Sequence, residues 1–411
     1  MRRWGSILAL LVLIGIAGWG GQPPPLPIPP FQEVTVCPEG PPKCDFTSIE
    51  AAIGIVTGGG VIEVLPGVYR ENIEIGKGLT LQGTVGVTII AKDPEQSVIY
   101  VNPGVENVTI TNLMITGSNK AGIEIGEGAK GIAIEGNWIS GGEPGIDGLM
   151  GLTVQIKPHA QVIVEGNTSV GTYILIDAAK VDIIDNVFLS PLAIGVRGGE
   201  VKVLRNMIYG GILIEGDSLT PVSANIEDNI IESILRGLEI RTGEWGVVRL
   251  RRNILAGNTL GGVIWVRSLE AQGNYIINSD NSNARQEGQG LIVLATEKID
   301  LVGNVVMGND ASGLILGLSQ SGEMRVENNI ILNNGRYGLA LLNPDCIHTY
   351  VTELLESIIP KEEWDEIEDK FYQGQLQGEV KGSDNLIAGN EEGDLCPEAY
   401  PWPEGFVREE G

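Results

Sequence analysis

The sequence is poor in histidine, in aromatic residues and in basic residues. It contains 2 His, 4 Cys and 5% aromatic residues, and its 27 Lys and Arg face 53 Asp and Glu. With so little His and no Cys-x-x-Cys spacing, neither a zinc site nor a Ser–His–Asp set is indicated. The net charge of −26 argues against nucleic acid and anionic membranes as partners, because both would repel the chain.

The few cysteines fit an oxidising compartment. Cys37 and Cys44 flank a Pro/Gly loop, and Cys346 and Cys396 bracket the C-terminal region. We expect each of these two pairs to form a disulfide, because its members lie near each other along the predicted fold.

The N-terminus is typical of an exported protein. A basic start is followed by the apolar run Ile7–Ala17, which predicts a signal peptide over residues 1–20 and leaves an uncleaved anchor open. No other membrane segment is predicted. Residues 21–36 are predicted to be a stiff Pro-rich linker. The expected location is therefore secreted, periplasmic or at the cell surface.

One phrase, apolar-x-apolar-x-x-Asn-x-apolar, returns at intervals of 19 to 30 residues. Its apolar pair alternates with period 2, which places both members on one face of a strand. A single repeat cannot bury that face, so stacked repeats must share a core. We predict an all-β, single-stranded parallel β-helix of about 11–12 coils, whose Asn amides hydrogen-bond between coils and tolerate a left-handed corner. The nine Asn residues are Asn137, Asn167, Asn186, Asn206, Asn229, Asn253, Asn274, Asn304 and Asn329.

Both ends of a solenoid need caps. The sequence Thr47-Ser-Ile-Glu50 predicts a capping box that starts an N-terminal helix. The predicted domains are a β-helix with its cap over 37–343, a helical insertion over 344–381, and a last coil with a C-terminal tail over 382–411. In the insertion, apolar residues recur at helical spacing on either side of Pro360.

The last coils contain strands that are apolar on both faces, such as Val263–Val266 and Leu291–Leu294. Soluble proteins avoid an exposed stripe of this kind. We therefore expect the helical insertion to fold back over it. The alternative is a lid or an element that docks a partner.

The stretches Phe46–Ile53, Gly60–Ile73 and Leu79–Gly83 resemble the opening of the pectin-lyase-like superfamily. They are most similar to pectin methylesterases and to periplasmic right-handed β-helix repeat proteins. The resemblance spans residues 46–342 and implies a right-handed parallel β-helix. That superfamily includes esterases, lyases, hydrolases, epimerases and non-catalytic members. The catalytic motifs of its methylesterases, lyases, polygalacturonases and alginate epimerases have no match in this sequence.

Charged residues alternate in sign along the aligned repeats, which predicts structural ion pairs between neighbouring coils. The positions just before the Asn read Asp185, Arg205, Asp228 and Arg252 in four successive repeats. The outward positions pair Asp182 with Lys202, Arg249 with Glu270, and Asp300 with Arg325.

One pair breaks this alternation. Glu135 and Glu165 occupy the same row on neighbouring coils, with Asp147 in the loop between them. Like charges that face each other favour a cation, so these three residues are the candidate metal site, with Ca²⁺ as the candidate cofactor. The alternative is two solvated Glu side chains that point apart.

Candidate ligand contacts are aromatic or lie in a long polar loop. Trp138, Trp245 and Tyr275 can stack on sugar faces, and Asp280 and Arg285 belong to the loop 278–289. We expect a non-catalytic protein that binds polysaccharide or a cell-envelope glycan, or that acts as a scaffold. The alternative is a polysaccharide-active, uronate lyase-like enzyme with an unrecognised site. The sequence does not indicate an oligomeric state.

Overall fold

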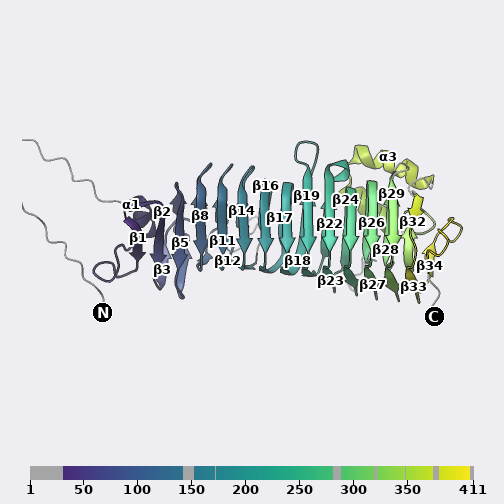
Figure 1. The fold of residues 1–411 in the computed structure, drawn as a ribbon, viewed down its shortest axis with the longest axis horizontal. Coiled ribbons are helices and arrows are strands. Elements are labelled where there is room, and N and C mark those ends of the chain that lie inside the picture. The colour runs from purple at the N-terminus through teal and green to yellow at the C-terminus, as the bar shows by residue number, and fades with distance from the viewer. Residues whose placement is uncertain are drawn as a thin grey trace, which may run out of the picture. The chain divides into compact units, whose positions relative to one another are not determined.

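The computed structural model describes residues 31–141, 152–171, 173–280, 288–318, 322–347, 349–373 and 379–407. In these residues the chain winds into a parallel β-helix, and each coil contributes one strand to each of three rows (Figure 1). All strand pairs are parallel, so every coil pairs with the coil before it and the coil after it. The predicted signal peptide and linker residues 21–30 lie outside the described residues.

The first row carries the apolar pair that precedes the Asn. Its strands are β1 (Phe31–Val36), β2 (Val56–Val64), β5 (Leu79–Gly83), β8 (Glu106–Thr111), β11 (Lys130–Glu135), β14 (Gln161–Glu165), the ends of β16 (Ile174–Ile184) and β17 (Val187–Leu204), β19 (Val222–Glu227), β22 (Gly246–Arg251), the ends of β24 (Leu260–Gln272) and β26 (Leu291–Val302), β29 (Glu323–Glu327) and β32 (Glu379–Lys381).

The second row follows the Asn corner and consists of short strands. They are β3 (Gly67–Arg70), β6 (Val87–Ile90), β9 (Met114–Thr116), β12 (Trp138–Ser140), β15 (Thr168–Val170), the starts of β17 and β18 (Met207–Glu215), β20 (Ile230–Glu232), β23 (Ile254–Ala256), β25 (Tyr275–Ile277), β27 (Val305–Met307), β30 (Ile330–Leu332) and β33 (Leu386–Ala388).

The third row closes each coil. It contains β4 (Ile73–Ile75), β7 (Ile99–Val101), β10 (Ala121–Ile125), β13 (Leu152–Ile156), the start of β16, the middle of β17, the end of β18, β21 (Arg236–Arg241), the starts of β24 and β26, β28 (Leu314–Leu318), β31 (Tyr337–Leu341) and β34 (Gly393–Cys396).

The repeated Asn residues form a continuous ladder inside the solenoid, which confirms the predicted bonds between coils. From Asn137 to Asn329, each backbone N–H and each side-chain Nδ2 donates to Oδ1 of the next Asn at 2.8–3.1 Å. Asn385 continues the ladder into the last coil. All of these side chains are buried. The ladder therefore satisfies the polar backbone of the corner without water.

The left-handed backbone at this corner belongs to the residue before the Asn and not to the Asn itself, so that part of the prediction is wrong. Asp185, Arg205, Asp228 and Arg252 have φ between 53° and 57°, and Gly136 has φ 62°. The Asn contributes its amide, whereas the preceding residue makes the turn. A non-Gly residue is costly in this conformation, and the buried ladder beside it holds the turn in place.

The predicted charge pairs along the first row are present. Both oxygens of Asp185 accept from Arg205 at 2.8 and 2.9 Å, and both oxygens of Asp228 accept from Arg252 at 2.7 and 2.8 Å. The outward pairs are Lys202–Asp182 at 3.5 Å, Arg249–Glu270 at 3.2 Å and Arg325–Asp300 at 3.7 Å. The Arg252 guanidinium lowers the pKa of Asp228 from its ordinary value.

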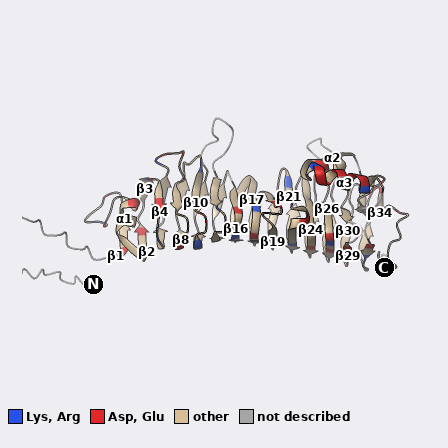
Figure 2. Ribbon diagram, turned by 90° about the horizontal axis from the view of Figure 1, so that it is seen from above, with Lys and Arg blue, Asp and Glu red and all other residues tan. Residues whose placement is uncertain are grey.

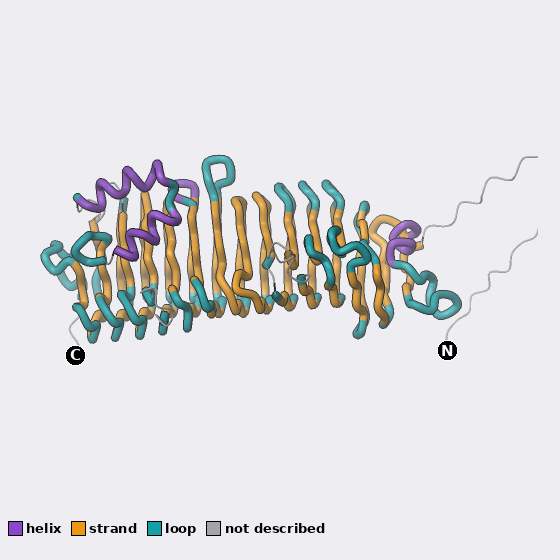
Figure 3. The backbone as a smooth tube through the Cα atoms, turned by 180° about the vertical axis from the view of Figure 1, so that it is seen from behind, coloured by secondary structure: helices purple, strands orange, loops and turns teal. Residues whose placement is uncertain are grey.

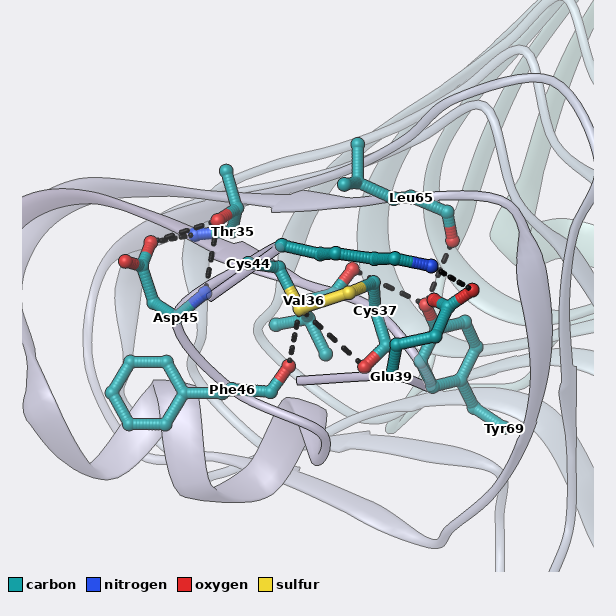
Figure 4. The surroundings of a disulfide bond; sticks show 10 residues. Thr35, Val36, Cys37, Glu39, Cys44, Asp45, Phe46, Leu65 and Tyr69 are labelled. Carbon is teal, nitrogen blue, oxygen red and sulfur yellow. Dashed lines mark hydrogen bonds and ion pairs between the residues drawn. A yellow bond between two sulfur atoms is a disulfide. The ribbon is translucent and has the colours of Figure 1, made fainter. Parts of the chain in front are cut away.

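The N-terminal end is closed by β1, the helix α1 (Ile49–Ile55) and the disulfide Cys37–Cys44 (Figure 4). Residues 31–36 were expected in the linker, but they pair with β2, so the linker must end before Phe31. The helix cap is Ser48, whose Oγ accepts from the backbone N–H of Ala51. The acidic residue at this cap is Glu71, which directly follows β3. Its carboxylate accepts from two backbone N–H groups of the first helical turn.

The C-terminal insertion forms the helices α2 (Thr349–Ile358) and α3 (Lys361–Tyr372), as the periodicity predicts. Its apolar side packs on the outer face of the last third-row strands (Figures 1 and 3), which confirms the expected cover. The residues of this second core include Val263, Trp265, Leu294, Ile315, Leu342, Val351, Leu354, Leu355, Ile358, Trp364 and Phe371.

The disulfide Cys346–Cys396 joins the base of the insertion to the last third-row strand, as expected. The predicted insertion boundary is too late, because residues 379–381 form β32 and pair with β29. Asp and Glu positions are frequent along the two helices (Figure 2). No helix among the described residues is long and apolar enough to span a bilayer.

Candidate functional site

A groove of about 570 Å³ crosses the outer face of the third row, directly beside the helical insertion. Four third-row positions supply its charged floor, and the loop 216–221 supplies a wall. The 3₁₀ turn η1 (Gly243–Trp245) and the ends of α2 and α3 complete it. The lining residues are Pro158, Asp177, Ala178, Arg197, Glu215, Gly216, Asp217, Thr220, Arg241, Thr242, Trp245, Trp265, Ile358, Pro360 and Glu363. We call this feature the third-row groove.

The floor of the groove is a register-aligned row of side chains. Asp177 pairs with Arg197, Arg197 with Glu215, Glu215 with Arg241, and Arg241 with Trp265 in successive coils. The four steps span roughly 19 Å along the axis, at about 4.8 Å per coil. An extended ligand that lies along the axis would therefore meet acid, base, acid, base and indole in order.

Two arginines are held in the groove by carboxylates. Arg197 lies 3.9 Å from Asp177 and 3.9 Å from Glu215, which is longer than a hydrogen bond. Arg241 lies 3.6 Å from Glu215 and also contacts Glu239. Burial lowers the pKa of the Arg241 guanidinium from its ordinary value, although Glu215 opposes this effect. Because these pairs are loose, N–H groups of Arg197 can also donate to a ligand that offers oxygen acceptors.

Two tryptophans close one end of the groove. The Trp245 side chain on η1 is 39% exposed, whereas Trp265 is 4% exposed and packs its ring against Gly243. Trp265 Nε1 and Arg241 Nε are both buried without a hydrogen-bond partner among the described residues. Buried donors of this kind cost free energy unless an acceptor reaches them. The site therefore combines a stacking surface with two unsatisfied donors.

The carboxylates of the groove have structural partners. Asp217 Oδ1 accepts from the backbone N–H of Leu219 at 2.8 Å, and from the N–H and hydroxyl of Thr220 at 2.9 and 3.0 Å. These hydrogen bonds, first of all the one from Leu219, lower the pKa of Asp217. Asp217 thus shapes the wall loop and is poorly suited to act as a general acid. Asp177 and Glu215 are engaged by the two arginines.

The structure separates the residues that were expected to bind substrate. Trp245 lies in the groove, whereas Trp138 and Tyr275 point outward from the second row. Asp280 follows the second row at a different corner, where its backbone N–H donates to Asn258 O at 2.8 Å. Arg285 lies outside the described residues. Of the described residues, Trp245 therefore lies apart from Trp138, Tyr275 and Asp280, and ligand binding at any of these positions stays a prediction.

Two of the three residues of the candidate cation site are described. Glu135 and Glu165 are direct neighbours on β11 and β14, as the repeat register predicts. Asp147 lies outside the described residues. Within the described part of the chain no group of three or more His, Cys, Asp or Glu residues is arranged to hold a metal ion. A calcium site at this position stays a prediction.

Sequence reasoning missed Arg197, Glu215, Arg241 and Trp265 as one row. A usable signal exists, because Glu215 and Arg241 each follow a strand-opening glycine, Gly211 or Gly237, by four positions. The third row has no buried Asn ladder through the middle coils that would reveal its register in the sequence. Loops of varying length before each third-row strand hide the alignment further.

Comparisons with known proteins agree with this architecture. The family model for a right handed beta helix region matches residues 200–352. The fold is similar to that of the periplasmic alginate epimerase AlgG, at 14% identity and a TM-score of 0.45, over 81% of this chain and 76% of that chain. No curated protein sequence matches the chain.

Two further solved structures are similar. PfbA, a surface adhesin of Streptococcus pneumoniae, is 11% identical with a TM-score of 0.45, over 84% of this chain and 87% of that chain. The Dettilon tailspike protein is 12% identical with a TM-score of 0.47, over 82% of this chain and 62% of that chain. The family match and the strand pairing thus describe a right-handed parallel β-helix. Structural similarities this low say nothing further about family or activity.

Proposed function

We propose that this chain binds a polysaccharide in the third-row groove without cleaving it. The observation that carries the proposal is the convergence of Trp245, Trp265, Arg197 and Arg241 on one elongated groove. Indole faces stack on the apolar faces of sugar rings, and guanidinium groups donate to hydroxyl and carboxylate oxygens. The groove follows the solenoid axis, so a linear glycan can run across several coils.

The charges of the groove support binding more than acid–base chemistry. Asp177 and Glu215 neutralise the arginines, and Asp217 is held in its loop with a lowered pKa. A general acid that works near neutral pH needs a raised pKa. The two disulfides also favour a working location outside the cytoplasm, at the cell surface or in the periplasm.

The uronate lyase-like alternative uses the same groove. Arg197 or Arg241 would neutralise a uronate carboxylate, and a base would remove the proton at C5. The C4–O glycosidic bond would break as the double bond between C4 and C5 forms, and its oxygen would leave, protonated, with the other fragment. This alternative predicts products with a new carbon–carbon double bond, which absorb in the ultraviolet. Incubation of the purified protein with uronate polymers separates the two proposals, because binding alone creates no absorbance.

Affinity electrophoresis in gels that contain neutral or uronic polysaccharides tests the binding proposal. We expect at least one polymer to retard the protein. The substitution Trp245→Ala is expected to weaken the affinity about fivefold, since a stacked ring contributes on the order of 1 kcal/mol. Trp138→Ala is the matched control, because Trp138 is 37% exposed, close to the 39% of Trp245, but lies on the second row. Equal losses in both variants, or no retardation by any polymer, would disprove a site in the groove.

A further inference from the structure

The outer face of the second row is apolar along almost the whole solenoid. The first outward position of each strand is occupied by Met114, Trp138, Thr168, Val187, Met207, Ile230, Ile254, Tyr275, Val305, Ile330 and Leu386, each paired in register with the next. We call this column the second-row stripe. Its strands follow one another along the lower edge of Figure 1, from β12 to β33. At about 4.8 Å per coil the stripe is roughly 48 Å long.

A second outward column widens the stripe. It holds Thr116, Ser140, Val170, Leu189, Tyr209, Glu232, Ala256, Ile277, Met307, Leu332 and Ala388. Across both columns of these described positions, Glu232 is the only acidic or basic residue. The first row differs sharply, because its outward positions carry the ion pairs between coils.

The stripe is exposed to an extent that soluble proteins rarely leave uncovered. Six residues of the first column and three of the second are 36–49% exposed, and these are Met114, Trp138, Met207, Ile230, Ile254, Tyr275, Leu189, Tyr209 and Met307. With about 200 Å² of surface for each large side chain, they expose roughly 700 Å². The half-buried residues between them add to this area. The helical insertion covers the third row and leaves the stripe open.

We propose that the second-row stripe binds the stripe of a second copy of this chain and forms a two-fold symmetric dimer. Together with the half-buried residues between them, the exposed side chains offer close to the roughly 800 Å² per partner that a stable protein interface buries. Charge also favours this face, because two chains with a net charge of −26 repel each other least where the surface is nearly uncharged. A two-fold contact uses the stripe once and closes, so it ends at the dimer.

Symmetry places Ile230 at the centre of the interface. Five stripe positions precede it and five follow it, so an antiparallel pair brings the two copies of Ile230 together. The third-row groove lies on a different row and stays accessible in both copies. The dimer therefore does not depend on the proposed glycan site.

Sedimentation equilibrium of the full chain tests this proposal, with Ile230→Glu as the variant. We expect a dimer for the wild-type chain, and a dissociation constant at least about 100-fold higher for the variant, because two like charges would meet at the two-fold axis. Ile163→Glu is the matched control, since Ile163 is 43% exposed and Ile230 42%, but Ile163 lies on the first row. The control is expected to remain a dimer.

A cysteine variant tests the dimer without the charged substitution Ile230→Glu, which could lose the dimer by misfolding. Every native cysteine in the described residues is in a disulfide, so Ile230→Cys introduces a single thiol. Mild oxidation is expected to link two copies covalently, whereas Ile163→Cys stays unlinked. A monomeric wild-type chain, or equal linking of both variants, would overturn the dimer. Flotation of the wild-type chain, but not Ile230→Glu, with phosphatidylcholine vesicles would instead identify a membrane as the occupant.

Discussion

Removal of one rung of the Asn ladder is expected to cost far more than removal of an outward Asn in the same coil. Asn229 is fully buried, and its Oδ1 accepts from the backbone N–H and Nδ2 of Asn206 at 2.8 and 3.0 Å. Its Nδ2 donates to Val203 O, Glu227 O and Asn253 Oδ1 at 2.8–2.9 Å. In Asn229→Ala the backbone N–H of Asn206 loses its acceptor in a dry interior.

A buried donor without a partner costs about 1–3 kcal/mol, and the other lost bonds add about 0.5–1.5 kcal/mol each. We therefore expect Asn229→Ala to lower the free energy of unfolding by about 2–5 kcal/mol. Asn225 is the matched control, because it lies on β19, the strand that leads into the Asn229 corner, faces outward and has an Oδ1 without a partner in the described chain. Asn225→Ala is expected to change stability by less than about 0.5 kcal/mol.

Urea denaturation followed by circular dichroism compares the two variants. Solenoids can unfold in stages, so the shift in the transition midpoint is the primary readout, and hydrogen exchange of residues 201–231 reports the local opening. Equal midpoints for Asn229→Ala and Asn225→Ala would refute the ladder as a source of stability.

Three further predictions concern the charge pairs and the insertion. Arg205→Glu places an acidic residue between Asp185 and Asp228, at the positions that precede the Asn in three successive coils. The variant is expected to have a lower melting temperature at low salt and a much smaller loss at high salt. A loss that does not depend on salt would contradict the pairing. Leu355→Asp puts a charge under α2 and is expected to increase binding of a hydrophobic dye, unlike the exposed control Ser357→Asp. Arg252 lowers the pKa of Asp228, so this pair stabilises the fold above pH ~4. Asp228→Asn is therefore expected to be less stable than the wild-type chain at neutral pH. This difference in the free energy of unfolding is expected to vanish as the pH falls through the pKa of Asp228 in the folded state.

The parts of the fold that were predictable from sequence have a fixed spacing of residues within each repeat, although the distance between repeats varies. Asn229 and its equivalents must lie at one buried corner, so the apolar pairs before them align the first row without ambiguity. The same alignment gave the Asp185–Arg205 contact. The insertion was predictable because its helical period interrupts the strand period and the neighbouring strands were apolar on both faces.

The groove was not predictable in the same way. Arg197, Glu215 and Arg241 become neighbours only when the third row is in register, and connections of varying length precede each of those strands. The aromatic residues were chosen by residue type alone. Residue type does not indicate that Trp138 lies on the second row and Trp245 in the groove. The second-row stripe had a visible signal, since the position after each Asn is usually apolar.

Hydrogen–deuterium exchange of the wild-type chain, with and without the polysaccharide that retards it, tests the binding site most directly. Bound glycan is expected to slow exchange in residues 215–221 and 236–246 and at the start of α3, which together line the third-row groove. Second-row strands are expected to exchange equally in both samples. Protection of the second row alone, or none at residues 236–246, would contradict a glycan site in the groove.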